Sequence, residues 1–202
     1  MVTRAVTSAN GATRQPVQAN LLVGIDDLTL VRAERLWAPL RLDVIERYLL
    51  GGRVGSLPQH VHWNWALKAL DHGVQHGHCA VELAGRIEGL MTLIVAGKSA
   101  RLPGAAGLPL AYIDYIETAP WNNQDFTAAP EYHGVGLRLM QAAVQYSLDA
   151  GWDGRVGLHS LPQAEGFYLT RCRMDSLGLD PHYSRLVYLE LPASQVADLL
   201  KG

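Results

Sequence analysis

The first residues that could do chemistry are two glycines, Gly134 and Gly136, which stand one residue apart where a strand is predicted to turn into a helix. At a helix N-terminus, unpaired backbone N–H groups and the positive end of the helix dipole favour an anion such as phosphate. Glycine suits this position because a side chain would hold the phosphate away from those N–H groups. An ordinary strand-to-helix turn explains the two glycines equally well, so the flanking elements matter.

The elements on either side fit an anion-binding turn. Residues 111–119 are rich in β-branched and aromatic side chains and end at Pro120, which predicts a buried strand. Residues 136–150 are apolar apart from one polar stripe, which predicts a helix lying against a sheet. The stripe consists of Arg138, Gln141, Gln145 and Asp149. Gly151 suits the left-handed conformation that often follows a helix.

A second strand and a second helix follow at 154–168, where apolar residues have helical spacing. In this arrangement the chain resembles the GNAT superfamily of acyl-CoA-dependent N-acyltransferases. Members of that family hold the CoA pyrophosphate on a Gly-x-Gly turn and the helix after it. A further strand and a helix with an Asn-x-x-Ala-x-x-(Phe/Leu)-Tyr pattern then follow. The matching residues are Gly134, Gly136, Ala164, Phe167 and Tyr168.

The resemblance covers residues 78–192 and implies an α+β fold, with one GNAT-like domain at 19–202. Its sheet would be mixed, mostly antiparallel and flanked by helices. The implied activity is that of an N-acyltransferase, more narrowly an N-acetyltransferase, moving an acetyl group from acetyl-CoA to a primary amine by direct attack in a ternary complex. The expected partners are acyl-CoA and a small-molecule or peptide amine, with a homodimer allowed. The identity of the amine and the preferred acyl chain stay open.

The resemblance also implies where acetyl-CoA binds. Backbone N–H groups beside a bulge late in the strand at 111–119 would face the thioester carbonyl, and such a donor lowers the barrier by ~3 kcal/mol. The other contacts belong to the turn, the helix start and the end of the next strand. The residues expected to bind the cofactor are Ile116, Thr118, His133, Gly134, Val135, Gly136, Leu137, Arg138 and Ser160.

Two catalytic residues are expected. Glu117 lies nearest the implied bulge and would take a proton from the amine, its alternative role being that of a partner for a neighbouring arginine. Tyr168 matches the family tyrosine that protonates the departing thiolate, its alternative role being that of a packed helix aromatic. Asp114 would point to the opposite face of the strand from Glu117. His159 would line the substrate cleft or hold a loop.

Aromatic and histidine residues crowd the segment at 57–72, which in the family borders the acceptor side. Trp63 and Trp65, with His60 and His62, could therefore line a substrate pocket, although core packing explains the tryptophans as well.

A metal site is not expected. His72 and His76 stand four residues apart, but Gly73 and Gly77 oppose a helix across them, and no His-Glu-x-x-His pattern is present.

Other function classes are weaker. The turn lacks the third glycine of a dinucleotide fingerprint, since Leu139 stands there, and no Gly-Lys-Ser/Thr follows it. A serine hydrolase would need a Gly-x-Ser-x-Gly elbow, which the chain lacks. The serious alternative is a GNAT-like fold that binds acyl-CoA or a protein partner without turnover. It is motivated by Glu131 and Leu161, which replace the Gln or Arg and the Asn of the family pattern.

Composition and charge exclude further classes. The chain has 202 residues, of which 49% are hydrophobic, enough for one domain with a substantial core. A net charge of −2 argues against a nucleic-acid clamp. Nothing in the sequence indicates a membrane span or a secretory signal, and Cys79 and Cys172 do not make a disulfide framework. We therefore expect a cytoplasmic protein.

The remaining segments give expectations about single elements. In chain order these are a flexible tail at 1–18, a first strand at one of two sites within 20–32, a helix from Leu40 with Pro39 in its first turn, a helix at 57–72, a hairpin at 79–96, a loop at 97–109, a strand at 182–191 and a helix at 195–200 capped by Ser194.

Overall fold

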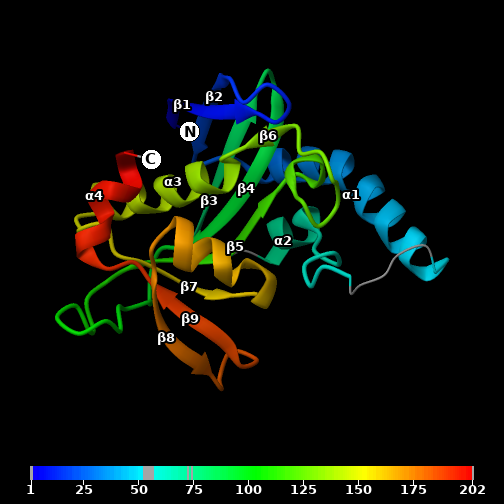
Figure 1. The fold of residues 1–202 in the computed structure, drawn as a ribbon. Helices are drawn as coiled ribbons and strands as arrows, with labels where there is room; N and C mark the ends of the chain where they lie inside the picture. The colour runs from blue at the N-terminus through cyan, green and yellow to red at the C-terminus, as the bar shows by residue number, and fades with distance from the viewer. Residues whose placement is uncertain (1, 52–56, 72, 74, 202) are drawn as a thin grey trace.

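The computed structural model describes residues 2–51, 57–71, 73 and 75–201, and a single sheet runs through it (Figure 1). Its strands are β1 (Val2–Asn10), β2 (Pro16–Val23), β3 (His76–Leu83), β4 (Arg86–Ile94), β5 (Ala111–Thr118), β6 (Tyr132–His133), β7 (Val156–Ser160), β8 (Asp175–Asp180) and β9 (Leu186–Glu190). They lie in the order β6-β1-β2-β3-β4-β5-β7-β9-β8. Within the described ranges every neighbouring pair is antiparallel except β5 and β7.

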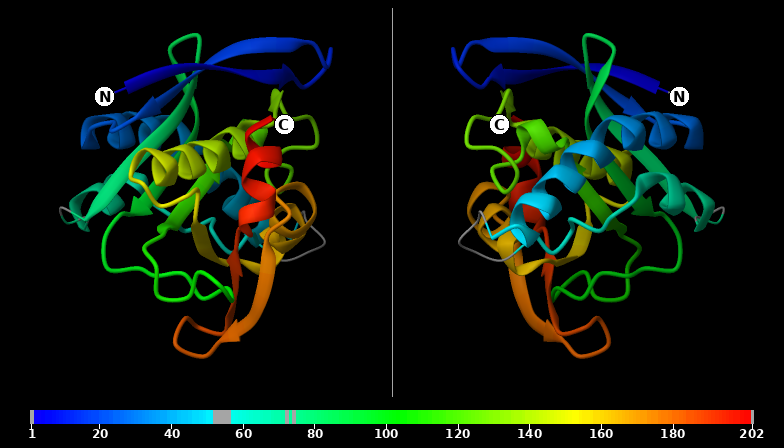
Figure 2. Two further views of the ribbon diagram at one scale, coloured as in Figure 1. Left: turned by 90° about the vertical axis from the view of Figure 1, so that its left-hand side faces the viewer. Right: turned by 90° about the vertical axis from the view of Figure 1, so that its right-hand side faces the viewer.

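Helices cover both faces of the sheet (Figure 2). They are α1 (Asp27–Leu49), α2 (Trp65–Asp71), α3 (Val135–Asp149) and α4 (Ala193–Lys201). Because successive side chains of a strand point to opposite faces, Leu21 and Val81 join the core under α3 and α4, whereas Leu22 and Ala80 join the core under α1 and α2. The predicted fold class, a mixed and mostly antiparallel sheet with flanking helices, is confirmed.

The neighbouring strands β5 and β7 separate part-way along their length. Their parallel pairing covers only 111–113 of β5 and 156–158 of β7. Directly afterwards the pairing of β5 with β4 skips Asp114, as it does at a β-bulge. The bulge was expected later in the strand, near Ile116 to Thr118. Its position at Asp114 opens the sheet from that residue onward.

Several elements follow the sequence closely. The strand expected at 111–119 is β5, the helix expected at 136–150 is α3, and the hairpin expected at 79–96 is formed by β3 and β4. Of the two sites weighed for a first strand, the one around Leu21 forms β2, whereas the other lies inside α1. No helix in the described part of the chain combines the length and apolarity needed to cross a membrane.

The N-terminal segment differs from the expected flexible tail. Residues 2–10 and 16–23 form the β1–β2 hairpin, and β1 also pairs with β6 through Ala9 and Asn10. Its position is fixed by tertiary contacts, including a 2.6 Å hydrogen bond from Arg138 Nε to the Thr7 carbonyl. Such a strand needs no hydrophobic periodicity of its own, so its sequence resembles that of a loop.

The helices differ from expectation at their ends. The first begins at Asp27 rather than Leu40, because Asp26 caps it by accepting a 2.9 Å hydrogen bond from the Thr29 N–H, and Pro39 lies inside it. The helix expected at 57–72 is reduced to α2, whose Leu67 and Leu70 point to solvent instead of inward.

Two smaller differences lie near the C-terminus. Ser194 is the second residue of α4 rather than its cap, and the edge strand β8 was not predicted. Most of β8 is exposed, so it lacks the apolar alternation by which a strand is recognised in the sequence.

Candidate active site

A cavity of ≈ 560 Å³ lies where β5 and β7 separate. Its walls come from β5, the start of α3, the chain after β7, and loops at 60–63 and 122–125. Most of the site predicted from the sequence meets here. The predicted residues that line it are Trp63, Asp114, Ile116, Glu117, Thr118, His133, Gly134, Val135, Gly136, Leu137, His159 and Tyr168.

The start of α3 forms one end of this cavity. Gly134 caps the helix with a φ of 85°, a left-handed conformation that glycine adopts without strain. The first bond of the helix runs from the Arg138 N–H to the Gly134 carbonyl at 3.0 Å, so the three preceding N–H groups have no helical partner. A Cβ on Gly136 would lie 3.5 Å from Phe167 and 3.8 Å from Thr118, both in the cavity wall. This end can bind an anion.

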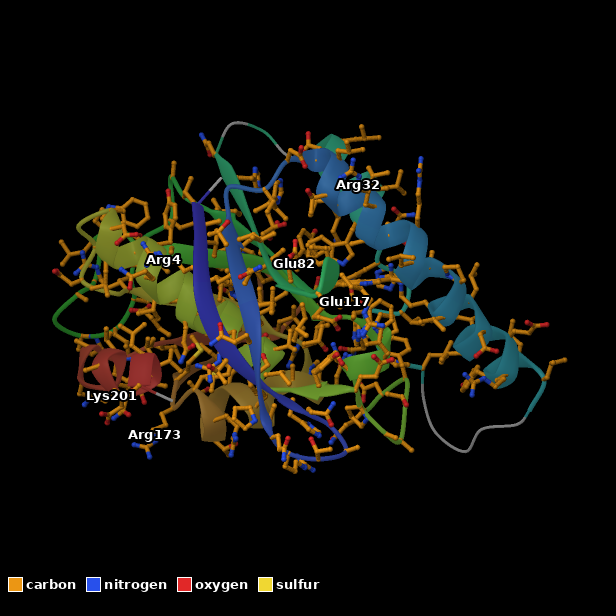
Figure 3. The ribbon with its side chains drawn as sticks, turned by 90° about the horizontal axis from the view of Figure 1, so that it is seen from above. Arg4, Arg32, Glu82, Glu117, Arg173 and Lys201 are labelled. Atoms are coloured by element: carbon orange, nitrogen blue, oxygen red, sulfur yellow. The ribbon has the colours of Figure 1, made fainter. Side chains whose placement is uncertain are left out.

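Glu117 projects from β5 into the region between the sheet and α1 (Figure 3). Only 4% of it is exposed. Its carboxylate accepts hydrogen bonds from Arg41 Nη1 at 3.2 and 3.3 Å and from Trp65 Nε1 at 2.6 Å. Burial raises the pKa of Glu117 to about 7, although Arg41 and the Trp65 N–H oppose that shift. Arg41 also pairs with the buried carboxylate of Glu34.

Tyr168 lies in a π-helical turn (Phe167–Arg171) after β7. It is 5% exposed, and its ring packs edge-on against Phe167 at 5.2 Å. Its hydroxyl makes no hydrogen bond to another described residue, and the residue lines the cavity. Burial raises the pKa of Tyr168 above its usual value, so the phenol is protonated at neutral pH. A proton donor is therefore available in the cavity.

We compared the sequence and the structure of the chain with those of known proteins. No protein-family model and no curated protein sequence matches the chain. Among solved structures, a protein described as a GNAT-family acetyltransferase from Desulfovibrio desulfuricans is 12% identical, with 87% of this chain and 99% of the other aligned at a TM-score of 0.51. A protein from Corynebacterium glutamicum, described as a histone acetyltransferase and related acetyltransferase, is also 12% identical, covering 93% and 97% at 0.50. The chain has the GNAT fold.

A further solved structure that is similar to part of this chain holds a ligand. It is described as a streptothricin acetyltransferase from Bacillus anthracis in complex with acetyl coenzyme A. It is 18% identical to this chain, with a TM-score of 0.40. The match covers 57% of this chain and 61% of the other protein, so it spans less than two thirds of that protein's length.

Three predicted site residues lie outside the cavity of this GNAT fold. Trp65 is fully buried and donates to Glu117, so it supports the site from behind instead of contacting a substrate. Arg138 reaches away from the turn to the Thr7 carbonyl and to Gln141 at 2.7 Å. Ser160 is buried and donates to the Leu161 carbonyl at 2.9 Å.

Asp114 and His159 line the same cavity from the two separated strands. Burial raises the pKa of Asp114, whose position in the bulge was not expected. His159 contacts Tyr112 through Nδ1 at 2.8 Å and Asp180 through Nε2 at 3.2 Å. Tyr112 and Asp180 were not predicted as site residues, because nothing in their local sequence indicates that they meet a histidine.

A hydrogen-bonded bridge between three distant segments was also not predicted from the sequence. The ring nitrogens of His60 contact the side-chain amides of Asn123 and Gln163, each at 3.2 Å, and all three residues line the cavity. Burial lowers the pKa of His60 to about 4, so it stays neutral at physiological pH. His60 was proposed as a pocket residue, but its partners come from distant segments that show no motif.

The structure shows no metal site in the residues that it describes: no three His, Cys, Asp or Glu side chains are grouped to hold an ion. His76 contacts the Gly73 carbonyl at 3.2 Å through Nδ1. His72, which was weighed with it, lies outside the described residues.

Proposed function

We propose that this chain is an acyl-CoA-dependent N-acyltransferase that moves an acetyl group from acetyl-CoA to a primary amine by direct attack. The observation that carries the proposal is the cavity itself. It joins the anion-binding start of α3, the unpaired edge of β5 beyond Ile113 and the free hydroxyl of Tyr168 on one surface. The GNAT fold supports the proposal, since the structures that share it are described as acetyltransferases.

The arrangement supplies the groups that acyl transfer requires. The phosphates of CoA would bind the N–H groups of Val135, Gly136 and Leu137. A neutral amine would attack the thioester carbonyl, and unpaired N–H groups of β5 would stabilise the negative oxygen that forms. As the C–S bond breaks, the Tyr168 hydroxyl would donate its proton to the thiolate. Acetylated amine and free CoA would then leave.

The test is turnover of acetyl-CoA with a panel of amines, followed by release of free CoA. The panel contains a diamine, an aminoglycoside, an amino-acid amide and a lysine-containing peptide. We expect release to depend on at least one of these amines. The alternative function, a GNAT-like fold that binds acyl-CoA without turnover, predicts binding of acetyl-CoA and no amine-dependent release with any of them.

Binding at the start of α3 gives the first prediction. A ligand at a hundred times its dissociation constant stabilises the folded state by ~2.7 kcal/mol, so acetyl-CoA should raise the melting temperature. Gly136→Glu should abolish that rise, because its side chain would occupy the anion site with a negative charge. The control is Gly73→Glu, where an added Cβ meets nothing within 4 Å and lies outside the cavity. A full acetyl-CoA shift in Gly136→Glu would contradict the assignment.

Glu117 gives the second prediction, because its geometry supports two roles. A pKa of about 7 suits a proton acceptor at neutral pH, whereas its bonds to Arg41 and Trp65 suit a structural anchor. Glu117→Gln is expected to lower the rate at pH 7 in either role. Recovery of the rate at high pH, where the amine is already neutral, would identify Glu117 as the base. A rate that stays low at every pH would identify it as an anchor.

A further inference from the structure

Three polar side chains form a connected chain beside the point where β5 and β7 cease to pair. The Tyr112 hydroxyl contacts His159 Nδ1 at 2.8 Å, and His159 Nε2 contacts Asp180 Oδ2 at 3.2 Å. The side chains of His159 and Asp180 are 3% and 8% exposed. Tyr112 and His159 both line the cavity, whereas Asp180 lies behind them. The chain therefore begins in the cavity wall at Tyr112, which is 5% exposed, and its other end is held by the protein.

The partners determine where each proton lies. Asp180 also accepts hydrogen bonds from Arg101 Nη1 at 2.7 Å and from the His182 N–H at 2.9 Å, and these bonds hold its pKa well below the usual range. Because this carboxylate can only accept, His159 Nε2 must carry its hydrogen. Nδ1 is then the unprotonated nitrogen, and the Tyr112 hydroxyl donates to it.

The charged and titratable groups around His159 favour this state at neutral pH. Tyr183 stacks on the imidazole at a ring distance of 3.9 Å and accepts a 2.5 Å hydrogen bond from Lys98. The Tyr188 ring lies 4.9 Å away on β9. Burial lowers the pKa of His159, as do the charges of Arg101 and Lys98, while Asp180 opposes them. The imidazole is thus neutral and has a carboxylate in place to stabilise a positive charge.

The position in the cleft suits the reacting atoms. Thr118 lies beside the anion-binding turn, and Tyr112 lies six residues earlier on β5, about 20 Å away at ~3.3 Å per residue. In acetyl-CoA the thioester is at the far end of an extended arm from the phosphates. With the phosphates at α3 and the arm along β5, the thioester would lie toward Tyr112 and the bulge at Asp114. Glu117, next to Thr118, lies nearer the phosphate end.

We propose that Tyr112, His159 and Asp180 form a proton relay that deprotonates the acceptor amine. This inference rests on the proposed acyltransferase function. A proton leaves the ammonium group for the Tyr112 oxygen as the tyrosine passes its own proton to His159 Nδ1. The resulting imidazolium is stabilised by the Asp180 carboxylate, and the neutral amine attacks the thioester. His159 later loses the proton to water, which restores the relay.

The experiment compares Tyr112→Phe and His159→Gln with a matched control, Tyr188→Phe. Tyr188 belongs to the same aromatic cluster but donates to Glu190 at 3.1 Å and does not line the cavity. With the amine that the wild type acetylates fastest, both relay variants should turn over ~10²–10⁴-fold more slowly at pH 7. Their rates should recover as the pH approaches the pKa of the ammonium group, about 10.4 for an alkyl amine, because the amine is then already neutral. Acetyl-CoA affinity should stay unchanged, and Tyr188→Phe should keep the wild-type pH profile.

Two results would overturn the relay without affecting the proposed function. One is a wild-type rate and pH profile in the folded Tyr112→Phe and His159→Gln proteins. The other is a turnover rate that recovers at high pH in Glu117→Gln but not in the relay variants. That result would identify Glu117 as the base that deprotonates the amine. If the wild type acetylates no amine in the panel, the proposed function fails and the relay fails with it.

A spectroscopic measurement tests the relay independently of turnover. Nitrogen NMR of the wild-type protein should show His159 as the neutral tautomer with hydrogen on Nε2 at pH 7. In Tyr112→Phe the Nδ1 signal should shift because it loses its donor. A cationic imidazole, or hydrogen on Nδ1, would overturn the proposal.

Discussion

Replacement of Tyr168 by phenylalanine is expected to lower turnover by ~10²–10⁴-fold and to leave the affinity for acetyl-CoA nearly unchanged. The phenol donates its proton only as the C–S bond breaks, so its loss affects the transition state and not the bound ground state. The variant should fold normally, because phenylalanine retains the ring that packs against Phe167 and the hydroxyl has no partner to lose among the described residues.

The control for Tyr168→Phe is Tyr146→Phe on α3, which removes a hydroxyl outside the cavity. Single-turnover measurements of CoA release and titration of acetyl-CoA separate the rate of the chemical step from binding. Since burial raises the pKa of Tyr168 above its usual value, wild-type activity should not fall through loss of this proton up to about pH 10. An unchanged rate in Tyr168→Phe would assign the residue to core packing alone.

Replacement of Arg41 by methionine should lower the free energy of unfolding by ~3–5 kcal/mol at neutral pH. The Arg41 side chain is 3% exposed and lies between the carboxylates of Glu34 and Glu117. Removing it leaves two buried carboxylates without their cation, and burial alone disfavours their charged forms. Chemical denaturation followed by tryptophan fluorescence measures the loss.

The sign of the pH dependence follows from the direction of the pKa shift. In the wild type the pKa of Glu117 is about 7 in the folded state, above its ordinary 4.5. A group whose folded pKa is raised contributes stability that is present below its unfolded pKa and is lost as the pH rises through the folded value. Without Arg41 the pKa of Glu117 rises further, because the cation that lowers it is gone, so the destabilisation should be larger at pH 8 than at pH 5.

Two further variants make the Arg41 prediction specific. Arg35→Met changes an exposed arginine of the same helix and should alter stability by less than about 0.5 kcal/mol. Adding Glu34→Gln and Glu117→Gln to Arg41→Met should restore part of the loss, because no buried charge is then left unpaired. Equal losses in Arg35→Met and Arg41→Met would show that the buried ion pairs do not stabilise the fold.

The sequence by itself determined the strand, turn and helix at the centre of the fold. Residues 111–119 form a strand because their side chains favour a pleated, buried surface, and the apolar face of 136–150 makes a helix. Gly134 marks the turn because few other residues adopt its φ of 85° without strain. These features depend on residues close together in the chain, so their pattern is visible without the fold. The resemblance to the GNAT family predicted Tyr168 as a catalytic residue, again from the spacing of residues that are close together in the chain.

Only the tertiary structure decided which side chains meet. Glu117 is bonded to Arg41 from 76 residues earlier, and His159 meets Tyr112 from 47 residues earlier and Asp180 from 21 residues later. The tertiary structure also decided the hairpin at the N-terminus, the bulge at Asp114 and the side-chain direction of Arg138. Such contacts depend on the packing of elements that are distant in sequence. Local periodicity, caps and turn preferences do not predict these contacts. Each partner adopts its own local backbone conformation whether or not the other partner is present.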